Sequence, residues 1–389
     1  MQLQYLSQHL RRIRDISATQ WNALAGSHPF LRHEFFSALE DSGCACAATG
    51  WTPQHLILSD EGGIAAAAPV YVKTHSWGEF VFDFSWARAF EQHGMDYFPK
   101  LLCAIPFTPA TGPRLLCRPD LPAEKLRAAL LEALRARANA QRLSSVHALF
   151  LDEPSRAACA AAGWLLRRDC HFQWHNRGYR DFEDFLAAFS AEKRKKARRE
   201  RRRVREQGIE FRTLDGTQIT DQQLDEVYAF HAMTFIRHGH APYLNRSFFE
   251  QVARSLGAAF MVKMAFRDGR PVAAAVFFRS TDTLYGRYWG AEADYHSLHF
   301  ETCYYQGIDY CIEQGLQRFE PGTQGEHKIA RGFEPAFTWS AHWIENAPMR
   351  RAIEAYLQRE GQSVEAYASE ADAHAPFRKD AGAEPGMEP

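Results

Sequence analysis

The sequence predicts an α/β (α+β) protein made of two tandem units, in which mixed sheets are flanked by helices. Two observations carry this prediction. Helical and strand-like patterns alternate along the chain, and each half runs from helices through a strand meander to a further helix and strand. The turn and alanine-rich strand of Asp60–Lys73 also recur in Arg267–Arg279. The length of 389 residues allows two or three domains, and the 46% hydrophobic content is ample for their cores.

The first unit is expected at residues 1–163. Apolar side chains at helical spacing predict helices at Arg32–Ser42, Ala123–Gln141 and Glu153–Ala162. Strands are expected at Gln54–Ser59, Ile64–Lys73, Glu79–Ser85 and Ser145–Phe150. The aromatic and proline-rich residues 86–120 predict no long helix. This unit is therefore expected to lack a helix that cradles a ligand and to be degenerate.

The second unit is expected at residues 164–365 and should carry the site. Its predicted helices are Asp181–Gln207, Asp221–Arg237, Ser247–Leu256, Glu301–Gln314 and Pro348–Gly361. Its predicted strands are His171–Gly178, Gly208–Leu214, Ala259–Arg267, Val272–Arg279 and Thr283–Trp289. Residues 366–389 are rich in Ala, Glu, Pro and Gly, which is typical of a disordered tail.

Composition excludes several classes of protein. The formal net charge of −1 gives no bulk attraction to nucleic acid or membrane, so any such attraction must be local. No apolar run is long enough to span a membrane, and the N-terminus does not read as a signal peptide. The eight cysteines form no Cys-x-x-Cys pair, which argues against a zinc ribbon and favours reduced thiols and a cytoplasmic location.

The stretch Arg318–Pro335 is the strongest candidate for a site. It combines three glycines with a run of ionisable side chains, and glycines let a backbone approach a ligand closely. We expect Lys328 to hold a phosphate or a developing oxyanion and His327 to move a proton. The alternative is a solvated loop. The preceding strand and helix favour the site, because α/β proteins commonly bind ligands where strands end.

Two neighbouring segments are expected to complete this pocket. Alternation on the predicted strand places Tyr285, Arg287 and Trp289 on one side. Arg287 then needs an anionic partner, which is either a substrate carboxylate or phosphate or one of the nearby residues Glu292, Asp294 and Glu301. At the start of the next helix, Glu301 is either the base for an incoming amine or a capping charge. The predicted substrate-binding residues are Tyr243, Tyr285, Arg287, Trp289, His299, Tyr305, Gly325, Glu326 and Arg331.

Ten basic residues crowd Lys193–Arg205, within the helix predicted at residues 181–207. Such density favours contact with a polyanion, either tRNA phosphates or an anionic membrane surface, over a merely solvated face. The predicted polyanion-binding residues are Lys193, Arg194, Lys195, Lys196, Arg198, Arg199, Arg201 and Arg202. No metal site is predicted, because the spacing of His231, His238 and His240 matches no known zinc pattern.

At this point the chain resembles a known family. The residues that carry the resemblance are His28–Leu31, Gly286–Gly290, Leu298–Gln306, Gly322–Lys328 and Arg331–Phe333. Together with the tandem order of the units, they are similar to bacterial FemAB-like proteins, which share the tandem GNAT (Gcn5-related N-acetyltransferase) architecture. One departure from ordinary GNAT enzymes is that Asp294–Phe300 lacks the glycine-rich loop that binds acetyl-CoA.

The resemblance implies two tandem GNAT-like units and transfer of an acyl or aminoacyl group to an amine (EC class 2.3). It also implies a role in cell-envelope or peptidoglycan-related metabolism. It implies no permanently bound cofactor, with acyl-CoA or aminoacyl-tRNA as co-substrate. The acceptor would be an amine-bearing small molecule or a cell-wall precursor. The alternative is a degenerate GNAT pair that recognises a cell-wall precursor or RNA without turnover.

Overall fold

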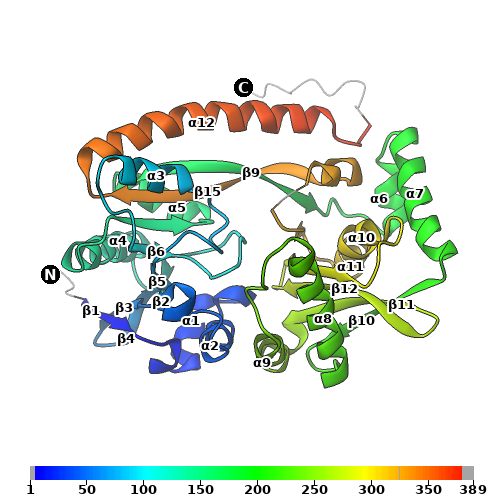
Figure 1. The fold of residues 1–389 in the computed structure, drawn as a ribbon, viewed down its shortest axis with the longest axis horizontal. Coiled ribbons are helices and arrows are strands. Elements are labelled where there is room, and N and C mark those ends of the chain that lie inside the picture. Colours follow the sequence, from blue (N-terminus) through cyan, green and yellow to red (C-terminus); the bar gives the residue numbers. More distant parts are fainter. Residues whose placement is uncertain (1–4, 324, 379–389) are drawn as a thin grey trace.

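The computed structural model describes residues 5–323 and 325–378. The chain folds into two α/β halves that lie side by side and are joined by long strands and a long helix (Figure 1). The strands are β1 (Leu6–Leu10), β2 (Trp51–Pro53), β3 (His55–Asp60), β4 (Gly63–Ala68), β5 (Val70–Lys73), β6 (Lys100–Cys103), β7 (Leu116–Cys117), β8 (Ser145–Leu149), β9 (Leu165–His175), β10 (Ile209–Asp215), β11 (Phe260–Arg267), β12 (Arg270–Arg279), β13 (Thr283–Ala291), β14 (Arg318–Glu320) and β15 (Glu334–Ile344).

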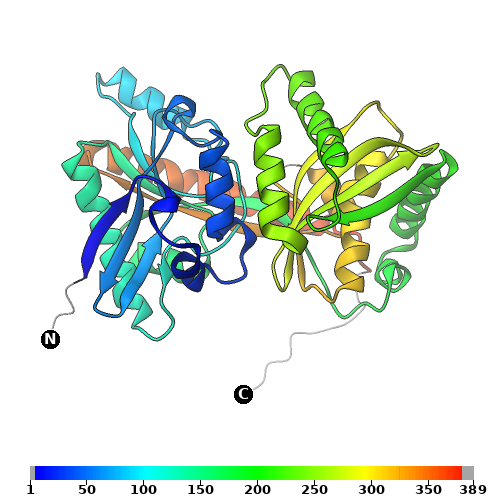
Figure 2. The same cartoon turned by 90° about the horizontal axis from the view of Figure 1, so that it is seen from below.

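Helices cover these strands on both halves (Figure 2). They are α1 (Ala18–Ala25), α2 (His33–Asp41), α3 (Phe84–Gln92), α4 (Ala123–Ala140), α5 (Glu153–Ala161), α6 (Phe182–Ala187), α7 (Ala191–Glu206), α8 (Asp221–Arg237), α9 (Arg246–Leu256), α10 (Leu298–Phe300), α11 (Gln306–Glu313) and α12 (Ala347–Ala373). A π-helical turn, η5 (Glu301–Tyr305), joins α10 to α11, and a 3-10 helix, η6 (Glu326–Arg331), precedes β15.

One mixed sheet runs through both halves in the order β10-β11-β12-β13-β14-β9-β15-β8-β6-β5-β2. A smaller sheet, β1-β3-β4-β7, lies in the first half. The chain returns to the first half near its end, because β15 pairs antiparallel with both β9 and β8. Helix α12 covers β9 and β15, and its Ile353 and Leu357 pack with Trp86 and Phe90 of α3. The division of the chain at residue 163 stays a prediction.

The two halves repeat one motif, a pair of parallel strands joined by a crossing helix. In the second half, β13 and β14 are parallel and the segment α10–η5–α11 connects them. In the first half, β6 and β8 are parallel and α4 connects them. The predicted fold class of tandem GNAT-like units is confirmed. The first unit thus has a crossing helix, α4, which follows the proline-rich segment instead of lying within it. The expectation that this unit is degenerate and cradles no ligand stays a prediction.

Caps and apolar faces explain why the helices of the second half form where they do. Thr220 accepts a hydrogen bond from the Gln223 backbone at 3.2 Å, and the Gln223 side chain accepts from the Thr220 backbone at 2.9 Å. Asn245 caps α9 through the Phe248 N–H at 3.0 Å. The buried face of α8 packs on β12 and β13. The bounds predicted for α8 are confirmed.

Three element predictions were wrong for physical reasons. The helix predicted at residues 181–207 is two helices, because Ser190 is extended and its N–H donates to the carbonyl of Pro376. The strand predicted at Glu79–Ser85 is an irregular segment that enters α3, because buried Lys100 draws its acidic side chains inward. The last helix ends at Ala373 and not at Gly361, so residues 366–373 are helical. Residues 379–389 of the predicted tail lie outside the described residues.

The crossing helix of the second half is not a regular helix as predicted. Its residues Glu301–Tyr305 form a π-helical turn between α10 and α11. Such turns are rare and are frequent at functional sites, because one extra residue re-aims the side chains of the turn. Here Glu301 and Tyr305 face α7, whereas Tyr304 faces η6.

Gly290 of β13 allows α8 to lie directly on the sheet. A Cβ at this position would lie 1.9 Å from the carbonyl oxygen of Phe230. We therefore expect Gly290→Ala to lower the free energy of unfolding by about 2–3 kcal/mol, because α8 must shift away from the sheet. Urea unfolding would measure this loss. Gly361→Ala is the matched control, since its Cβ would meet only the flexible end of Arg168, and an equal loss in both variants would contradict the explanation.

Candidate functional site

A pocket opens where β13 and β14 separate. The two strands pair at only three positions, the last being Tyr285 with Glu320. Beyond this point the strands diverge, and side chains of the first half approach the gap. Two adjoining hollows share Pro109, Arg287 and Gly322, and the larger has a volume of about 240 Å³. We call them together the seam pocket, lined by Phe80, Phe107, Pro109, Ala110, His171, Phe172, Gln173, His231, Thr234, Phe235, Tyr243, Leu244, Tyr285, Gly286, Arg287, Tyr288, Trp289, Glu320, Gly322 and Thr323.

Arg287 is the extra residue of a β-bulge. In the register of β12 with β13, Val276 is opposite Tyr288 and Phe277 is opposite Gly286, so Arg287 has no partner. A bulge reverses the alternation of side chains that follow it. Tyr285 accordingly packs in the core next to the first half, whereas Trp289 packs on the other side of the sheet, against His299. The prediction that Tyr285, Arg287 and Trp289 face one way was wrong.

Two cations in this region have no carboxylate as an ion-pair partner among the described residues. Half-buried Arg287 donates to the carbonyl of Phe107 at 2.6 Å, and its Nε atom has no partner in that part of the chain. Buried Lys328 donates to the carbonyl of Gly322 at 2.7 Å. Burial lowers the pKa of Arg287 and lowers that of Lys328 to about 7. None of the protein carboxylates that the sequence offered to Arg287 pairs with it.

A carboxylate and an imidazole stand beside these cations. Burial raises the pKa of Glu320 to about 7, although Arg318 and a backbone hydrogen bond from Thr111 favour its charged form. Burial also lowers the pKa of His171 to about 4, and the charges of Lys328 and Arg287 lower it further. The seam pocket therefore holds a carboxyl group that exchanges a proton near neutral pH and an imidazole that is neutral there.

Aromatic side chains from both halves form the wall of the seam pocket. Phe107 of the first half stacks on Tyr243 of the second, with ring centroids 5.2 Å apart and planes 11° apart. Phe235 also lines this wall, and the β13 strand at Trp289 borders the same hollow. The predicted residues Tyr243, Tyr285, Arg287 and Trp289 thus line one pocket, although they do not share one face of a strand.

His327 lies in an aromatic cluster next to Lys328. Its Nε2 is 2.8 Å from the Tyr304 hydroxyl, and its ring lies 5.9 Å from that of His299. Burial lowers the pKa of both imidazoles to about 4, and the neighbouring cations lower it further. His327 also packs on Gly325, whose φ of 112° is open to glycine but rarely to other residues. A proton-transfer role for His327 stays a prediction.

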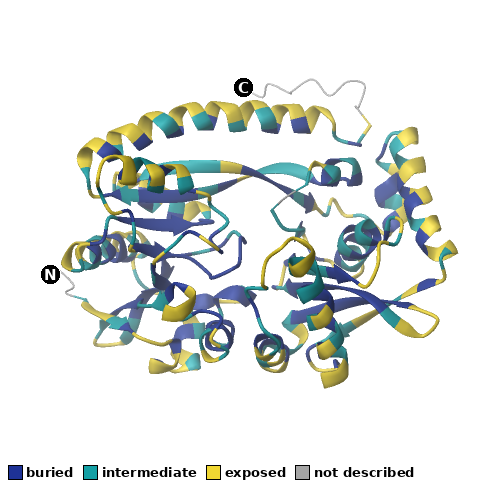
Figure 3. Ribbon diagram, in the orientation of Figure 1, coloured by how far each residue is buried: buried dark blue, intermediate teal, exposed yellow. Residues whose placement is uncertain are grey.

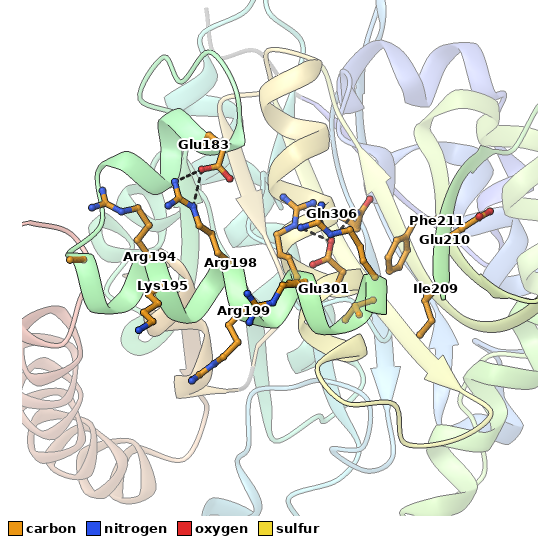
Figure 4. Close-up of a pocket in the computed structure, with 15 residues that line it drawn as sticks. Glu183, Arg194, Lys195, Arg198, Arg199, Ile209, Glu210, Phe211, Glu301 and Gln306 are labelled. Carbon is orange, nitrogen blue, oxygen red and sulfur yellow. Dashed lines mark hydrogen bonds and ion pairs between the residues drawn. The ribbon is translucent and has the colours of Figure 1, made fainter. Parts of the chain in front are cut away.

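Glu301 does not lie in the seam pocket. It is 4% exposed and lines a groove between α7 and the outer strand β10 (Figure 4). Its Oε1 accepts hydrogen bonds from Arg201 at 3.2 Å and Gln306 at 2.8 Å, and Oε2 has no partner in the described chain. Burial raises its pKa, and Arg201 opposes this. The prediction of a single pocket for Glu301, Arg287 and Lys328 was wrong, because the π-turn points Glu301 away from the strands. Lys328 lines neither cavity, but it donates to the carbonyl of Gly322, which lines the seam pocket.

Arg331 and Tyr305 meet inside the protein at a buried carboxylate. Arg331 donates to Glu200 at 2.8 Å and to the carbonyl of His327 at 2.6 Å, and the Tyr305 hydroxyl donates to Glu200 at 2.8 Å. These contacts fasten η5 and η6 to α7. Glu326 is exposed and lines neither the seam pocket nor the groove. Arg331, Tyr305 and Glu326 are therefore not brought to either cavity.

The groove over α7 has a volume of about 860 Å³. Helix α7 buries one stripe, formed by Ala197, Glu200 and Val204, and its other faces are mostly exposed (Figure 3). Arg198 pairs with Glu183, and Arg201 pairs with Glu301 and Asp309. Of the predicted polyanion-binding residues, the groove is lined by Arg194, Lys195, Arg198, Arg199, Arg201 and Arg202. Arginine and lysine make up seven of the fifteen residues that line the groove.

Sequence reasoning missed Glu320, His171 and Phe107. Glu320 could have been found, because it is a charged residue at the end of a short strand, directly before Pro321. The other two come from segments far away in sequence, and only the pairing of β14 with β9 and the contact between the halves bring them here. No group of metal-ligating side chains occurs in residues 5–323 and 325–378. No helix there is long and apolar enough to span a membrane.

Comparisons with known proteins assign the chain to a family. No curated protein matches the sequence. Among solved structures, FemX has a TM-score of 0.54 at 13% identity, over 90% of this chain and 100% of that chain. The C-terminal domain (DUF2156) of a protein described as a lysylphosphatidylglycerol synthetase of Agrobacterium fabrum has a TM-score of 0.52 at 12% identity, over 89% and 95%. A protein of unknown function from Bacteroides thetaiotaomicron has a TM-score of 0.51 at 12% identity, over 84% and 97%.

These likenesses show the fold. The family assignment comes from the sequence itself. The model of the FemAB-like family, described as peptidoglycan biosynthesis/recognition, matches residues 12–379. This match covers both halves, including the seam pocket and the basic groove. The chain therefore belongs to the FemAB-like family.

Proposed function

We propose that this protein transfers an acyl or aminoacyl group from an ester or thioester to an amine, and that transfer takes place in the seam pocket. The observation that carries the proposal is the pair of cations Arg287, which lines the seam pocket, and Lys328, which donates to Gly322 of its lining. Neither forms an ion pair with a carboxylate among the described residues. Cations that are removed from solvent and have no carboxylate partner are stabilised by an anionic ligand or by an oxyanion that forms during the reaction.

The chemistry needs few groups. The amine nitrogen attacks the carbonyl carbon of the donor, a C–N bond forms, and the C–O or C–S bond to the carrier breaks. Glu320 takes the proton that the nitrogen loses, since its pKa of about 7 suits a base near neutral pH. Lys328 stabilises the negative charge on the carbonyl oxygen. The departing carrier oxygen or sulfur takes up a proton from solvent.

An aminoacyl-tRNA is the donor that the groove favours. The groove is open, and seven of its fifteen lining residues are arginine or lysine, the side chains that bind phosphate backbones. Helix segment η5 lies between the groove and η6, because Glu301 lines the groove and Tyr304 contacts His327 next to Lys328. Membership of a peptidoglycan-related family and the fold of FemX make an amine of a cell-wall precursor the first acceptor to test.

The test offers acetyl-CoA, a long-chain acyl-CoA and charged tRNA in turn, with hydroxylamine as a small amine acceptor. A UDP-linked muramyl peptide with a free lysine amine is the second acceptor. With at least one donor, we expect hydroxamate or an acylated peptide to form, and mass spectrometry would detect either product. The Lys328→Met substitution should lower the rate of transfer about 100-fold. If a donor binds but no group is transferred to either acceptor, the transfer proposal is contradicted and recognition without turnover becomes the better explanation.

The groove itself gives a separate prediction. Changing Lys195, Arg199 and Arg205 to glutamine removes three exposed cations that are in no ion pair among the described residues. We expect tRNA affinity to fall at least tenfold, and the slope of log Kd against log salt to fall by about two. The control changes Lys125, Arg351 and Arg359, which are exposed cations on α4 and α12, and should leave both values unchanged. An equal loss in both variants would contradict a specific groove.

A further inference from the structure

The larger hollow of the seam pocket contains a buried imidazole that the proposed transfer chemistry does not use. His231 of α8 is 2% exposed and lines this hollow. Its Nε2 atom has no hydrogen-bond partner in the described chain. Its ring instead packs against those of Phe235, Phe249 and Tyr288, with centroids 4.8, 5.1 and 5.0 Å away. A buried polar atom without a partner is costly, so a ligand with a hydrogen-bonding group would stabilise this position.

The protonation state of His231 indicates which polar group suits it. Burial lowers its pKa to about 4, so the imidazole is neutral at neutral pH. A neutral imidazole carries one N–H donor and one acceptor nitrogen. An ammonium group can only donate and a carboxylate can only accept, whereas a hydroxyl group can do both. A hydroxyl group therefore satisfies the Nε2 atom in either tautomer.

The walls of the larger hollow are mainly aromatic. Phe80 and Phe107 come from the first half, and Phe235 and Tyr243 come from the second. The volume of about 240 Å³ exceeds that of an apolar cavity of about 150 Å³, which is already sufficient to bind benzene. The hollow can therefore hold an aromatic ring with a substituent, and ring-to-ring contacts with its walls would favour such a group.

The charge of the hollow excludes a cationic ligand group. Among the described residues that line it, Arg287 carries the one ionic charge, and no carboxylate is present. Glu320 lines only the smaller hollow. A lysyl or arginyl side chain in the larger hollow would face a like charge and lose its hydration without gaining an anionic partner.

The two hollows differ in what they can hold. Arg287 and Gly322 line both of them, so a single ligand can extend from one to the other. The smaller hollow, which Glu320 lines, has a volume of about 10 Å³, which is room for about one water-sized group. A substrate that places its reacting carbonyl group beside Glu320 must therefore direct its bulk into the larger hollow.

From these observations we propose that the larger hollow selects the transferred group, and that it takes an uncharged aromatic side chain with a hydroxyl group that hydrogen-bonds to His231. A tyrosyl group has this chemistry, whereas a phenylalanyl group lacks the hydroxyl and a lysyl group carries a charge. Binding of such a ring rests on the hollow alone, but selection of the transferred group rests also on the proposed function.

Calorimetric titration with amino acid methyl esters tests the binding step without any transfer. We expect tyrosine methyl ester to bind about tenfold or more tightly than phenylalanine methyl ester, because the phenyl ring leaves His231 unpaired. Lysine methyl ester should bind more weakly than both, since its ammonium group finds no anion in the hollow.

Variants of His231 separate its hydrogen bond from its packing. His231→Phe should abolish the preference for the tyrosine ester and leave the affinity for the phenylalanine ester within about twofold. His231→Gln, whose amide keeps a donor and an acceptor, should retain part of the preference. His374→Phe is the matched control, because His374 is exposed at the end of α12, bonds to the carbonyl of Glu370 and lines neither hollow. It should change neither affinity.

Equal binding of the two aromatic esters, or a preference that survives in His231→Phe, would overturn the inference. Transfer to hydroxylamine from tyrosyl-, phenylalanyl- and lysyl-tRNA, above the rate without protein, is the second measurement. Hydroxylamine has no side chain, so faster transfer from the tyrosyl donor would support selection of the transferred group. Equal transfer from the three donors, or transfer from acyl-CoA alone, would overturn that selection and leave the proposed function intact. Selective binding of the tyrosine ester without transfer from any donor would contradict the proposed function and keep the hollow as a binding site.

Discussion

Replacement of Glu320 by glutamine is expected to lower kcat for transfer about 100-fold or more, with little change in KM. The amide has nearly the same size and can still accept a hydrogen bond from Gln173 or Arg318, but it cannot take a proton from the attacking amine. Steady-state kinetics with hydroxylamine as acceptor would measure both constants.

The pH profile tests the same assignment more sharply. Glu320 must be deprotonated to act, so the rate should rise with pH up to about 7. Lys328 must be protonated to stabilise the oxyanion, so the rate should fall above about 7. We expect a bell-shaped profile. Glu320→Gln should remove its acid limb, and Lys328→Arg should remove its alkaline limb.

Glu334→Gln is the control for this series. Glu334 lies in the same loop region, but it pairs with Arg177 at the protein surface and lines neither the seam pocket nor the groove. It should leave kcat and the pH profile unchanged. A Glu320→Gln variant with full activity, or one whose acid limb persists, would remove Glu320 from the mechanism and leave its raised pKa as a consequence of burial alone.

Replacement of Lys100 by methionine is expected to be the most destabilising of these substitutions, by about 3–5 kcal/mol. Lys100 is fully buried and neutralises Glu79 and Asp83, and removal of one partner of a buried ion pair leaves the other charges without compensation. Chemical denaturation would measure the loss. Lys73→Met is the control, since Lys73 contacts the Trp51 ring and a carbonyl and has no carboxylate at ion-pair distance among the described residues.

The loss of unfolding free energy caused by Lys100→Met should depend on pH, because it comes from the two buried carboxylates. Without Lys100, burial raises the folded-state pKa of Glu79 and Asp83 above their unfolded values of about 4. Their protonated forms then favour the folded state, so stability is highest below about pH 4 and falls as pH rises through the raised values. The loss should therefore grow from pH 4 to pH 7. A loss independent of pH would contradict the ion-pair explanation.

Much of the fold follows from local patterns. Helices α2, α4, α5, α8 and α9 lie within a residue or two of their predicted bounds, because each has a continuous apolar face and a clear end. The meander β11–β13 follows from its alanine-rich strands and the Asp268-Gly269 turn. The recurrence of Asp60–Lys73 in Arg267–Arg279 correctly indicated two related units.

The failures occur where distant segments override local preference. A bulge at Arg287, set by the register of β12 with β13, reversed the faces of Tyr285 and Trp289. A π-turn moved Glu301 to the groove over α7. Lys100, far along the chain, turned the segment 79–85 from a strand into a loop that displays its aromatic residues.

For the candidate site, too, part of the information lies in the sequence and part only in the tertiary structure. The sequence by itself determined that Arg318–Pro335, the strand before it and the basic helix carry the ionisable groups of interest, because such composition serves no packed core. Only the tertiary structure decided that Arg287 lies with Glu320 and His171 in one pocket, while Glu301 and the basic residues form a separate groove. The physical reason is that a site between two units depends on strand register and on the contact of two surfaces, and neither leaves a periodic signal in the sequence.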